Sequence, residues 1–268
     1  MAIKTYLAVG SVCWDEIPAG GRLHRELGGS VLFAARVAQQ RGWKVTIITS
    51  GTAELEAAVR AELGTGVELI VQPSVEDTVM RFTEETHLGP RSVPTSADQI
   101  RFSEVTGHLA TADVVHIAPI LDEIAEGGFE HLSEAKFVGV TPQGFLRTRN
   151  HETAALGLAH SAPTWWASNC DAVVLSESET AHFSVPLTEL AQSVVVTRGS
   201  NGCIGYRGDQ HLELDALKVQ EAVGATIGAG DVFSATLFME LASGVEFGRA
   251  MALANERAGR HVATGSLN

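Results

Sequence analysis

Short apolar runs and longer amphipathic stretches alternate along the first part of the chain. The apolar runs predict buried strands, and the apolar residues at helical spacing between them predict helices. Ser30 is a candidate N-cap for the first helix, and Gly42 is a candidate stop. The strands are expected at residues 6–12, 44–50 and 67–71, and the helices at about 28–42 and at 52–63.

The same alternation returns later in the chain. Between residues 202 and 221, short apolar runs separated by turn residues predict antiparallel strands. Strands that alternate with helices predict an α/β fold with a mostly parallel central sheet. Further strands are expected at 114–118, 137–140, 173–175 and 194–197, a mostly helical stretch at 120–132, and two closing helices at 232–242 and 247 to about 262.

Two segments break this rhythm. Residues 13–27 are polar with no strong period, and residues 76–94 contain a short alternating run, from Val79 to Thr83, with no helix after it. We expect both segments to form a small appendage over one edge of the sheet, within a single domain that spans residues 1–268.

The composition is that of a globular protein, with 45% hydrophobic and 19% charged residues among 268. A net charge of −13 disfavours nucleic acid or an anionic membrane as the main partner. The 3 cysteines lack CxxC spacing, which favours neither a disulfide framework nor structural zinc. The first apolar run is too short for a signal peptide and no run suits a membrane span, so we expect a cytoplasmic protein.

The stretch Ala225-Thr226-Ile227-Gly228-Ala229-Gly230-Asp231 stands directly before an apolar helical pattern. Small residues let the backbone approach a ligand closely, and N–H groups at a helix start favour an anion. Asp231 can accept a proton from a hydroxyl while those N–H groups hold a phosphate. Together they predict phosphoryl transfer to an alcohol. The alternative is a glycine-rich turn whose Asp231 only caps the next helix.

This stretch is similar to the signature of the ribokinase-like (PfkB) carbohydrate kinases, in which Gly-Ala-Gly-Asp follows a Thr two residues upstream, here Thr226. The order of expected elements also resembles that family. The resemblance implies a ribokinase-like α/β three-layer sandwich with a central mostly parallel sheet and a small β lid, formed by about 13–27 and 76–94. It implies Asp231 as the catalytic base and Gly228, Ala229 and Gly230 as the anion hole.

The resemblance also implies residues that bind the substrate. Asp15, beyond the first strand, matches a position that binds sugar hydroxyls, although an Asx turn would also use it. Gly28 and Gly29 match a glycine-rich signature that lies against the sugar; a helix entry is the alternative. Phe33 stands where the family usually has an Asn, and its ring offers a wall in place of a hydrogen bond, which argues against ribose-type recognition.

Residues 142–147, Pro-Gln-Gly-Phe-Leu-Arg, are similar to a stretch found in small-sugar and polyol kinases. Gln143 or Arg147 is expected to face the cleft, where a guanidinium would match a phosphate; a surface arginine is the alternative. Glu179 matches the Glu of the family's Asn-x-x-Glu, which helps to organise Mg²⁺ and its waters, with Ser176 in place of the Asn. An acidic residue in the first turn of a helix is the alternative for Glu179.

A nucleotide loop is also implied. Thr197, Gly199 and Gly202 match the family's Thr-x-Gly-x-x-Gly, and Asn255 is a candidate for the adenine pocket. A strand-to-hairpin turn and an ordinary polar helix residue are the respective alternatives. Ala225 replaces an Asp that helps to order a monovalent-cation site in the family, so potassium activation is not expected.

The implied function is an ATP-dependent kinase that uses Mg²⁺ and phosphorylates a hydroxyl of a sugar, a nucleoside or a polyol such as myo-inositol. A catalytically weak ligand-binding or regulatory protein on the same fold is the alternative, motivated by Phe33, Ser176 and Ala225. A P-loop kinase and a nicotinamide oxidoreductase are disfavoured, because neither glycine motif is present. Some relatives form homodimers through lid strands, but this short lid offers little edge to pair.

Overall fold

The structure is a computed structural model that describes residues 3–84, 91–127, 129–220 and 226–265. Within these residues a central sheet of nine strands has the order β15-β14-β13-β12-β9-β8-β1-β4-β5. Pairing is parallel from β5 to β13 and antiparallel at the β14–β15 edge, as the sequence predicts. The strands are β1 (Thr5–Val9), β4 (Lys44–Gly51), β5 (Val67–Pro73), β8 (Val114–Ile117), β9 (Val138–Val140), β12 (Ala172–Ser176), β13 (Ser193–Thr197), β14 (Cys203–Arg207) and β15 (Gln210–Leu214).

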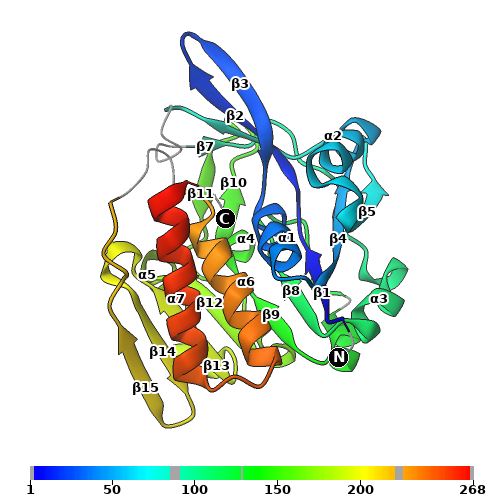
Figure 1. The fold of residues 1–268 in the computed structure, drawn as a ribbon. Coiled ribbons are helices and arrows are strands. Elements are labelled where there is room, and N and C mark those ends of the chain that lie inside the picture. Colours follow the sequence, from blue (N-terminus) through cyan, green and yellow to red (C-terminus); the bar gives the residue numbers. More distant parts are fainter. Residues whose placement is uncertain (1–2, 85–90, 128, 221–225, 266–268) are drawn as a thin grey trace.

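Helices cover both faces of this sheet, because side chains alternate between two cores along each strand. In β1, Tyr6 and Ala8 enter one core while Leu7 and Val9 enter the other. The first core packs under α1 (Ser30–Gln40), α2 (Ala53–Leu63), α6 (Ala229–Ala242) and α7 (Phe247–Thr264). Figure 1 shows α1, α6 and α7 side by side on that face.

Short helical segments cover the second face. They are α3 (Thr106–Thr111) and the 3₁₀ turns at Phe102–Glu104, Phe129–Glu134, Ala167–Asn169 and Leu187–Glu189. The remaining elements are α4 (Gln143–Leu146), α5 (Glu177–Thr180), the β10–β11 pair (Arg147–Arg149 and Leu156–Leu158), and 3₁₀ turns at Gly64–Gly66 and Gly199–Asn201. The result is the three-layer α/β sandwich that the sequence predicts. No helix among the described residues is both long and apolar enough to cross a membrane.

The two segments that break the sequence rhythm form a separate four-stranded sheet of order β3-β2-β6-β7. Its strands are β2 (Cys13–Ala19), β3 (Arg22–Gly28), β6 (Val79–Phe82) and β7 (Arg91–Ser92). The β2–β3 hairpin projects from the body of the molecule (Figure 1). Residues 85–90 of the second segment lie outside the described residues.

The helix expected over 120–132 is wrong. Residues 120–127 are irregular apart from an isolated β-bridge at Ile124, and a 3₁₀ turn spans Phe129–Glu134. The buried carboxylate of Glu123 accepts hydrogen bonds of 2.8 Å from the N–H groups of Ser11, Ile120 and Leu121. The side chain thus pairs backbone donors of this buried loop, so the loop does not need helical hydrogen bonds to satisfy them. The carboxylate also ties this loop to the end of β1.

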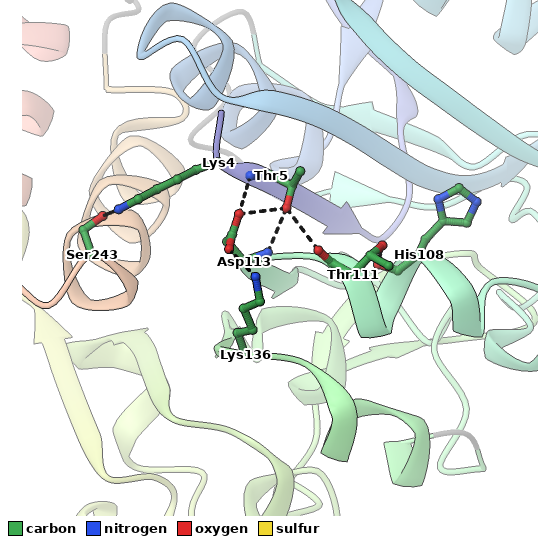
Figure 2. Close-up of polar contacts among 7 residues, drawn as sticks. All are labelled: Lys4, Thr5, His108, Thr111, Asp113, Lys136 and Ser243. Carbon is green, nitrogen blue, oxygen red and sulfur yellow. Dashed lines mark hydrogen bonds and ion pairs between the residues drawn. The ribbon is translucent and has the colours of Figure 1, made fainter. Parts of the chain in front are cut away.

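At the opposite end of the sheet, Asp113 joins the starts of β1 and β8. Its Oδ2 accepts hydrogen bonds from the N–H and the hydroxyl of Thr5 at 2.8 and 3.0 Å, and its Oδ1 accepts one from Lys136 at 2.8 Å (Figure 2). Partial burial pushes the pKa of Asp113 up, but the hydrogen bonds from Lys136 and Thr5 outweigh it and hold the pKa below its usual value.

We expect Asp113→Ala to lower the free energy of unfolding by about 1–3 kcal/mol, because it leaves the Thr5 N–H without its acceptor. Lys136→Met should cost no more than about 1 kcal/mol, as for an exposed ion pair. Urea unfolding at pH 7 measures both. Because the pKa of Asp113 is lowered by folding, its contribution is complete above its unfolded-state pKa and is lost as the pH falls through the folded-state value. An Asp113→Ala effect that persists in full at low pH would contradict this assignment.

Candidate functional site

Two neighbouring cavities lie at the carboxyl ends of the central strands, where ligands bind in open α/β sheets. The first has a volume of about 290 Å³ and the second of about 560 Å³. Thr226 and Gly230, at the start of α6, line both cavities. The polar residues of the first cavity include Asp15, Ser30, Arg91, Gln143, Arg147 and Asp231.

Asp231 lies in the first turn of α6 and lines the first cavity. Burial raises the pKa of its carboxyl to about 6, against a hydrogen bond from Ser30 and the positive charge of Arg147, which lower it. A carboxylate with this pKa is a better proton acceptor than an ordinary aspartate and is still ionised at neutral pH. Gly228, the N-cap of α6, has φ 75°, and within the described residues no side chain caps this helix start. The Ala229 N–H lies 3.3 Å from the Thr226 carbonyl oxygen in the turn that precedes the helix. The other N–H groups of this helix start can face an anion.

Ser30 was expected to cap α1, and this expectation is wrong. Gly29 is the N-cap, with φ 105°, and Ser30 lines the first cavity together with Asp231, whose pKa it lowers. A Cβ on Gly29 would lie 2.4 Å from the Ser11 carbonyl oxygen, and one on Gly28 would lie 2.2 Å from the Asp15 carboxylate. The glycine pair thus lets the helix start and the Asp15 carboxylate approach each other closely. Gly28 itself pairs with Cys13 and is not part of the cavity wall.

Asp15, on β2, is the second carboxylate of the first cavity. Burial raises its pKa to about 6, against a hydrogen bond from the Cys13 thiol and the positive charges of Arg91 and Arg147, while Glu26 adds to the rise. An ionised carboxylate beside two guanidinium groups can accept hydrogen bonds from ligand hydroxyls. This geometry places Asp15 and Asp231 on the walls of one small cavity.

Phe33 lines the first cavity and packs against the catalytic loop predicted from the sequence. A Cβ on Gly228 would lie 2.4 Å from the Phe33 ring. The ring therefore fills the space behind the left-handed turn at Gly228. It supports the loop in addition to forming the wall expected from its sequence position.

Arg147 begins β10 directly after α4, and its guanidinium donates a hydrogen bond of 2.8 Å to the carbonyl of Ile120. Burial lowers the pKa of Arg147 to about 10, and the neighbouring charge of Arg91 lowers it further. The side chain remains cationic at neutral pH. Gln143, from the same turn, lines the cavity too. The sequence pattern gives no signal for Arg91, which arrives from β7 of the small sheet and lies over the ring of Phe82 at 4.9 Å.

The second cavity gathers the residues of the predicted nucleotide loop. Thr197, Gly199, Gly202 and Asn255 line it, together with Ala229 and Gly230 of the α6 start. Apolar side chains form much of the remaining wall, from Leu217, Val219, Phe233 and Val262. The amide of Asn255 donates a 2.7 Å hydrogen bond to the carbonyl of Asp215, so it holds one rim of the cavity. Ala225, the position tied to potassium activation, lies outside the described residues.

Glu179 lines neither of these two cavities. Its carboxylate accepts a hydrogen bond of 2.7 Å from the Ser176 N–H in a capping box at the start of α5. The negative charge of Glu179 nevertheless acts to raise the pKa of both Arg147 and Asp231. Among the described residues no group of three or more histidine, cysteine or acidic side chains could hold a metal. A single carboxylate outside the two cavities fits an outer contact to a hydrated Mg²⁺ carried by phosphates. The described residues alone do not form a closed metal site.

The sequence model described as pfkB family carbohydrate kinase matches residues 15–266. No curated protein sequence matches the chain. Among solved structures, a pyrophosphate-dependent kinase in the ribokinase family, complexed with a pyrophosphate analog and myo-inositol, has a TM-score of 0.80 at 19% identity and covers 96% of this chain and 94% of its own.

Two ribokinases are also similar. The enzyme from Thermotoga maritima has a TM-score of 0.74 at 13% identity, with 99% of this chain and 95% of that chain covered. The Arabidopsis thaliana ribokinase complexed with ribose and ATP has a TM-score of 0.68 at 14% identity, with the same coverage. At these identities the structural similarity concerns the fold.

Proposed function

Because the chain belongs to the pfkB family of carbohydrate kinases, we propose that it transfers the γ-phosphate of ATP to a hydroxyl of a small polyol or sugar. The observation that carries the proposal is the position of the α6 start between the two cavities. Thr226 and Gly230 line both cavities, Asp231 lines the first, and Ala229 lines the second. A phosphoryl group that passes from one cavity to the other would cross these N–H groups.

In this proposal Asp231 accepts the proton of the attacking hydroxyl. The backbone N–H groups of Gly228, Ala229 and Gly230 stabilise the charge that develops on the transferred phosphoryl group. Arg147, with its pKa of about 10, supplies a positive charge on the first-cavity side. Asp15 and Gln143 orient the acceptor through its other hydroxyls. The small sheet of β2, β3, β6 and β7 would act as a lid that excludes water, the competing acceptor.

ATP is the donor that the second cavity supports best. Three similar structures are pyrophosphate-dependent kinases, so pyrophosphate is the competing donor. A pyrophosphate has no apolar surface to bury, whereas a nucleoside does. The apolar walls from Leu217, Val219 and Val262, in a cavity of about 560 Å³, suit a nucleoside. Thr197, Gly199 and Asn255 would lie along it.

Mg²⁺ would arrive with the donor phosphates, and Glu179 would contact its water shell. When bound, such an ion neutralises phosphate charge and so assists transfer. The protein would contribute the carboxylate of Glu179 near the ion and would not surround the ion with its own ligands.

The acceptor cavity favours a small ring with several hydroxyls. Its volume of about 290 Å³ is well below that of the donor cavity, which argues against a nucleoside. Its walls combine polar groups from Asp15, Ser30 and Gln143 with the ring of Phe33. A polyol or cyclitol presents hydroxyls at its edge and C–H bonds on its face, and matches both kinds of wall. myo-Inositol, which the similar pyrophosphate-dependent kinase binds, is the first candidate.

The test is acceptor-dependent phosphate transfer with purified protein, Mg²⁺ and either ATP or pyrophosphate as donor. The panel includes myo-inositol, other cyclitols, linear polyols, hexoses, ribose and nucleosides, and ³¹P NMR identifies the product. We expect turnover with ATP and a cyclitol or small sugar. Turnover with pyrophosphate alone would contradict the donor assignment, and ATP binding without transfer to any acceptor would favour a ligand-binding protein on this fold.

A further inference from the structure

A histidine of α7 binds the backbone of the loop that begins α6. His261 is 6% exposed, and its Nε2 lies 2.7 Å from the carbonyl oxygen of Ile227. A carbonyl oxygen can only accept, so Nε2 carries the hydrogen and the tautomer of His261 is fixed by this contact. Ile227 lines the first cavity and directly precedes Gly228.

The contact sets the direction of a catalytic N–H group. The peptide between Ile227 and Gly228 is planar, so its carbonyl and its N–H point in opposite directions. Because the Ile227 carbonyl is held toward α7, the Gly228 N–H is held pointing away from α7. Gly228 has φ 75°, and a glycine rotates between such conformations at little cost. Phe33 limits the space beside Gly228, and the turn bond from the Ala229 N–H to the Thr226 carbonyl spans this peptide. The hydrogen bond from His261 acts on the Ile227 carbonyl itself and so favours one direction of the peptide.

The same helix holds the second cavity through a similar contact. Asn255, on α7, donates to the Asp215 carbonyl at 2.7 Å, just as His261 binds the Ile227 carbonyl. One contact secures the rim of the donor cavity and the other secures the loop between the cavities. The two residues therefore have separable effects, although they share a helix and a type of bond.

We propose that His261 is a positioning residue for phosphoryl transfer, whose Nε2–H holds the Ile227–Gly228 peptide in the orientation that forms the anion hole. The inference rests on the proposed function for its kinetic consequence, and on the hydrogen bond alone for its structural one. It assigns to α7 a role in the chemical step, in addition to its role in covering the sheet.

The experiment compares His261→Gln with His261→Asn. The terminal amide nitrogen of Gln can occupy the place of Nε2, whereas that of Asn reaches only the place of Nδ1. Both variants are polar and similar in size, so they test the reach of the donor. We expect kcat of His261→Gln to stay within about threefold of wild type, and kcat of His261→Asn to fall about 10- to 100-fold, since misplacement of a catalytic group by about 1 Å has effects of that size. KM for both substrates should change little.

Asn255→Leu is the matched control on the same helix. It removes a side chain–carbonyl bond at the donor cavity, so it should raise KM for the donor with a much smaller effect on kcat. Thermal unfolding of all three variants reports loss of stability separately. If Gln and Asn at position 261 lower kcat equally, or if neither does, the positioning role is refuted. If His261→Asn does not fold, failure of His261→Gln to retain kcat still refutes it.

Imidazole NMR tests the contact without reference to turnover. In ¹⁵N-histidine-labelled protein the His261 ring, assigned by its absence in His261→Gln, should carry its hydrogen on Nε2, and that proton should exchange slowly with solvent. A hydrogen on Nδ1 alone would overturn the inference. If wild-type protein transfers no phosphate to any acceptor, the proposed function fails, and this spectrum still decides whether His261 holds the loop.

Discussion

Asp231→Asn is expected to lower kcat by about 10²–10⁴-fold, the size of effect seen when a positioned general base is removed. Asn keeps the shape and the position in the first turn of α6 but cannot accept the proton of the attacking hydroxyl. Steady-state ADP release at saturating donor and acceptor measures the loss. Asp209→Asn, in the exposed turn between β14 and β15, is the matched control and should leave kcat unchanged.

The pH profile gives the same prediction a second readout. Burial raises the pKa of Asp231 to about 6, so kcat/KM should fall as the pH drops through about 6 and the base is protonated. Asp15 also has a pKa of about 6 and titrates in the same range. In Asp15→Asn, where acceptor binding is weakened, the acid limb of kcat should persist, because the base remains. If Asp231→Asn retains more than about a tenth of kcat, Asp231 is not the base.

Arg147→Met is expected to lower kcat/KM by about 10²–10³-fold, because it removes a buried positive charge from the wall where phosphoryl charge develops. Arg147→Lys keeps the charge but loses the planar guanidinium group, so its kcat/KM should lie between those of the wild type and of Arg147→Met. The positive charge of Arg147 also lowers the pKa of Asp231. Without that charge the pKa of Asp231 rises, and the acid limb of the pH profile should move to higher pH.

Arg149 provides the control for this second substitution. It lies two residues further along β10, yet its guanidinium bonds to the Ser96 hydroxyl and the Pro94 carbonyl, away from the first cavity. Arg149→Met should change kcat/KM far less than Arg147→Met and leave the acid limb in place. Equal losses in the two variants, or an unshifted limb in Arg147→Met, would show that Arg147 acts only through the stability of the fold.

The central sheet could be predicted because its signal is local. Strands such as β1 and β13 are buried on both faces and appear in the sequence as continuous apolar runs. The segment at 120–132 misled for the same reason. Its apolar residues are spaced like a helix, but Ile120 packs under the small sheet, whereas Ile124 packs in the second core of the central sheet, with Leu7 and Val9. Local periodicity does not record that neighbouring side chains enter different cores.

Residues of the candidate site could be predicted from the sequence only where they belong to a short local motif. Asp231 and the glycines beside it have such a motif. Ser30, Glu123 and His261 do not, because the partner of each lies far away along the chain. No spacing rule links Glu123 to the Ser11 N–H, or His261 to the Ile227 carbonyl. Arg91 arrives from a two-residue strand that only the folded sheet can place.

The order of elements along the chain has a consequence for synthesis on the ribosome. All nine strands of the central sheet precede α6, so the sheet can pair before α6 and α7 have emerged. Until then, Val174 and Val195 on the sheet and the inner side of α1 lack the helices that cover them. A nascent chain paused after β15 therefore exposes a wide apolar face, the kind of surface that aggregates unless a chaperone covers it. Residues of α6, of α7 and of the loop before α6 form part of the cavity walls, so the cavities are complete only after these helices have docked. The onset of ligand binding would therefore report that α6 and α7 are in place.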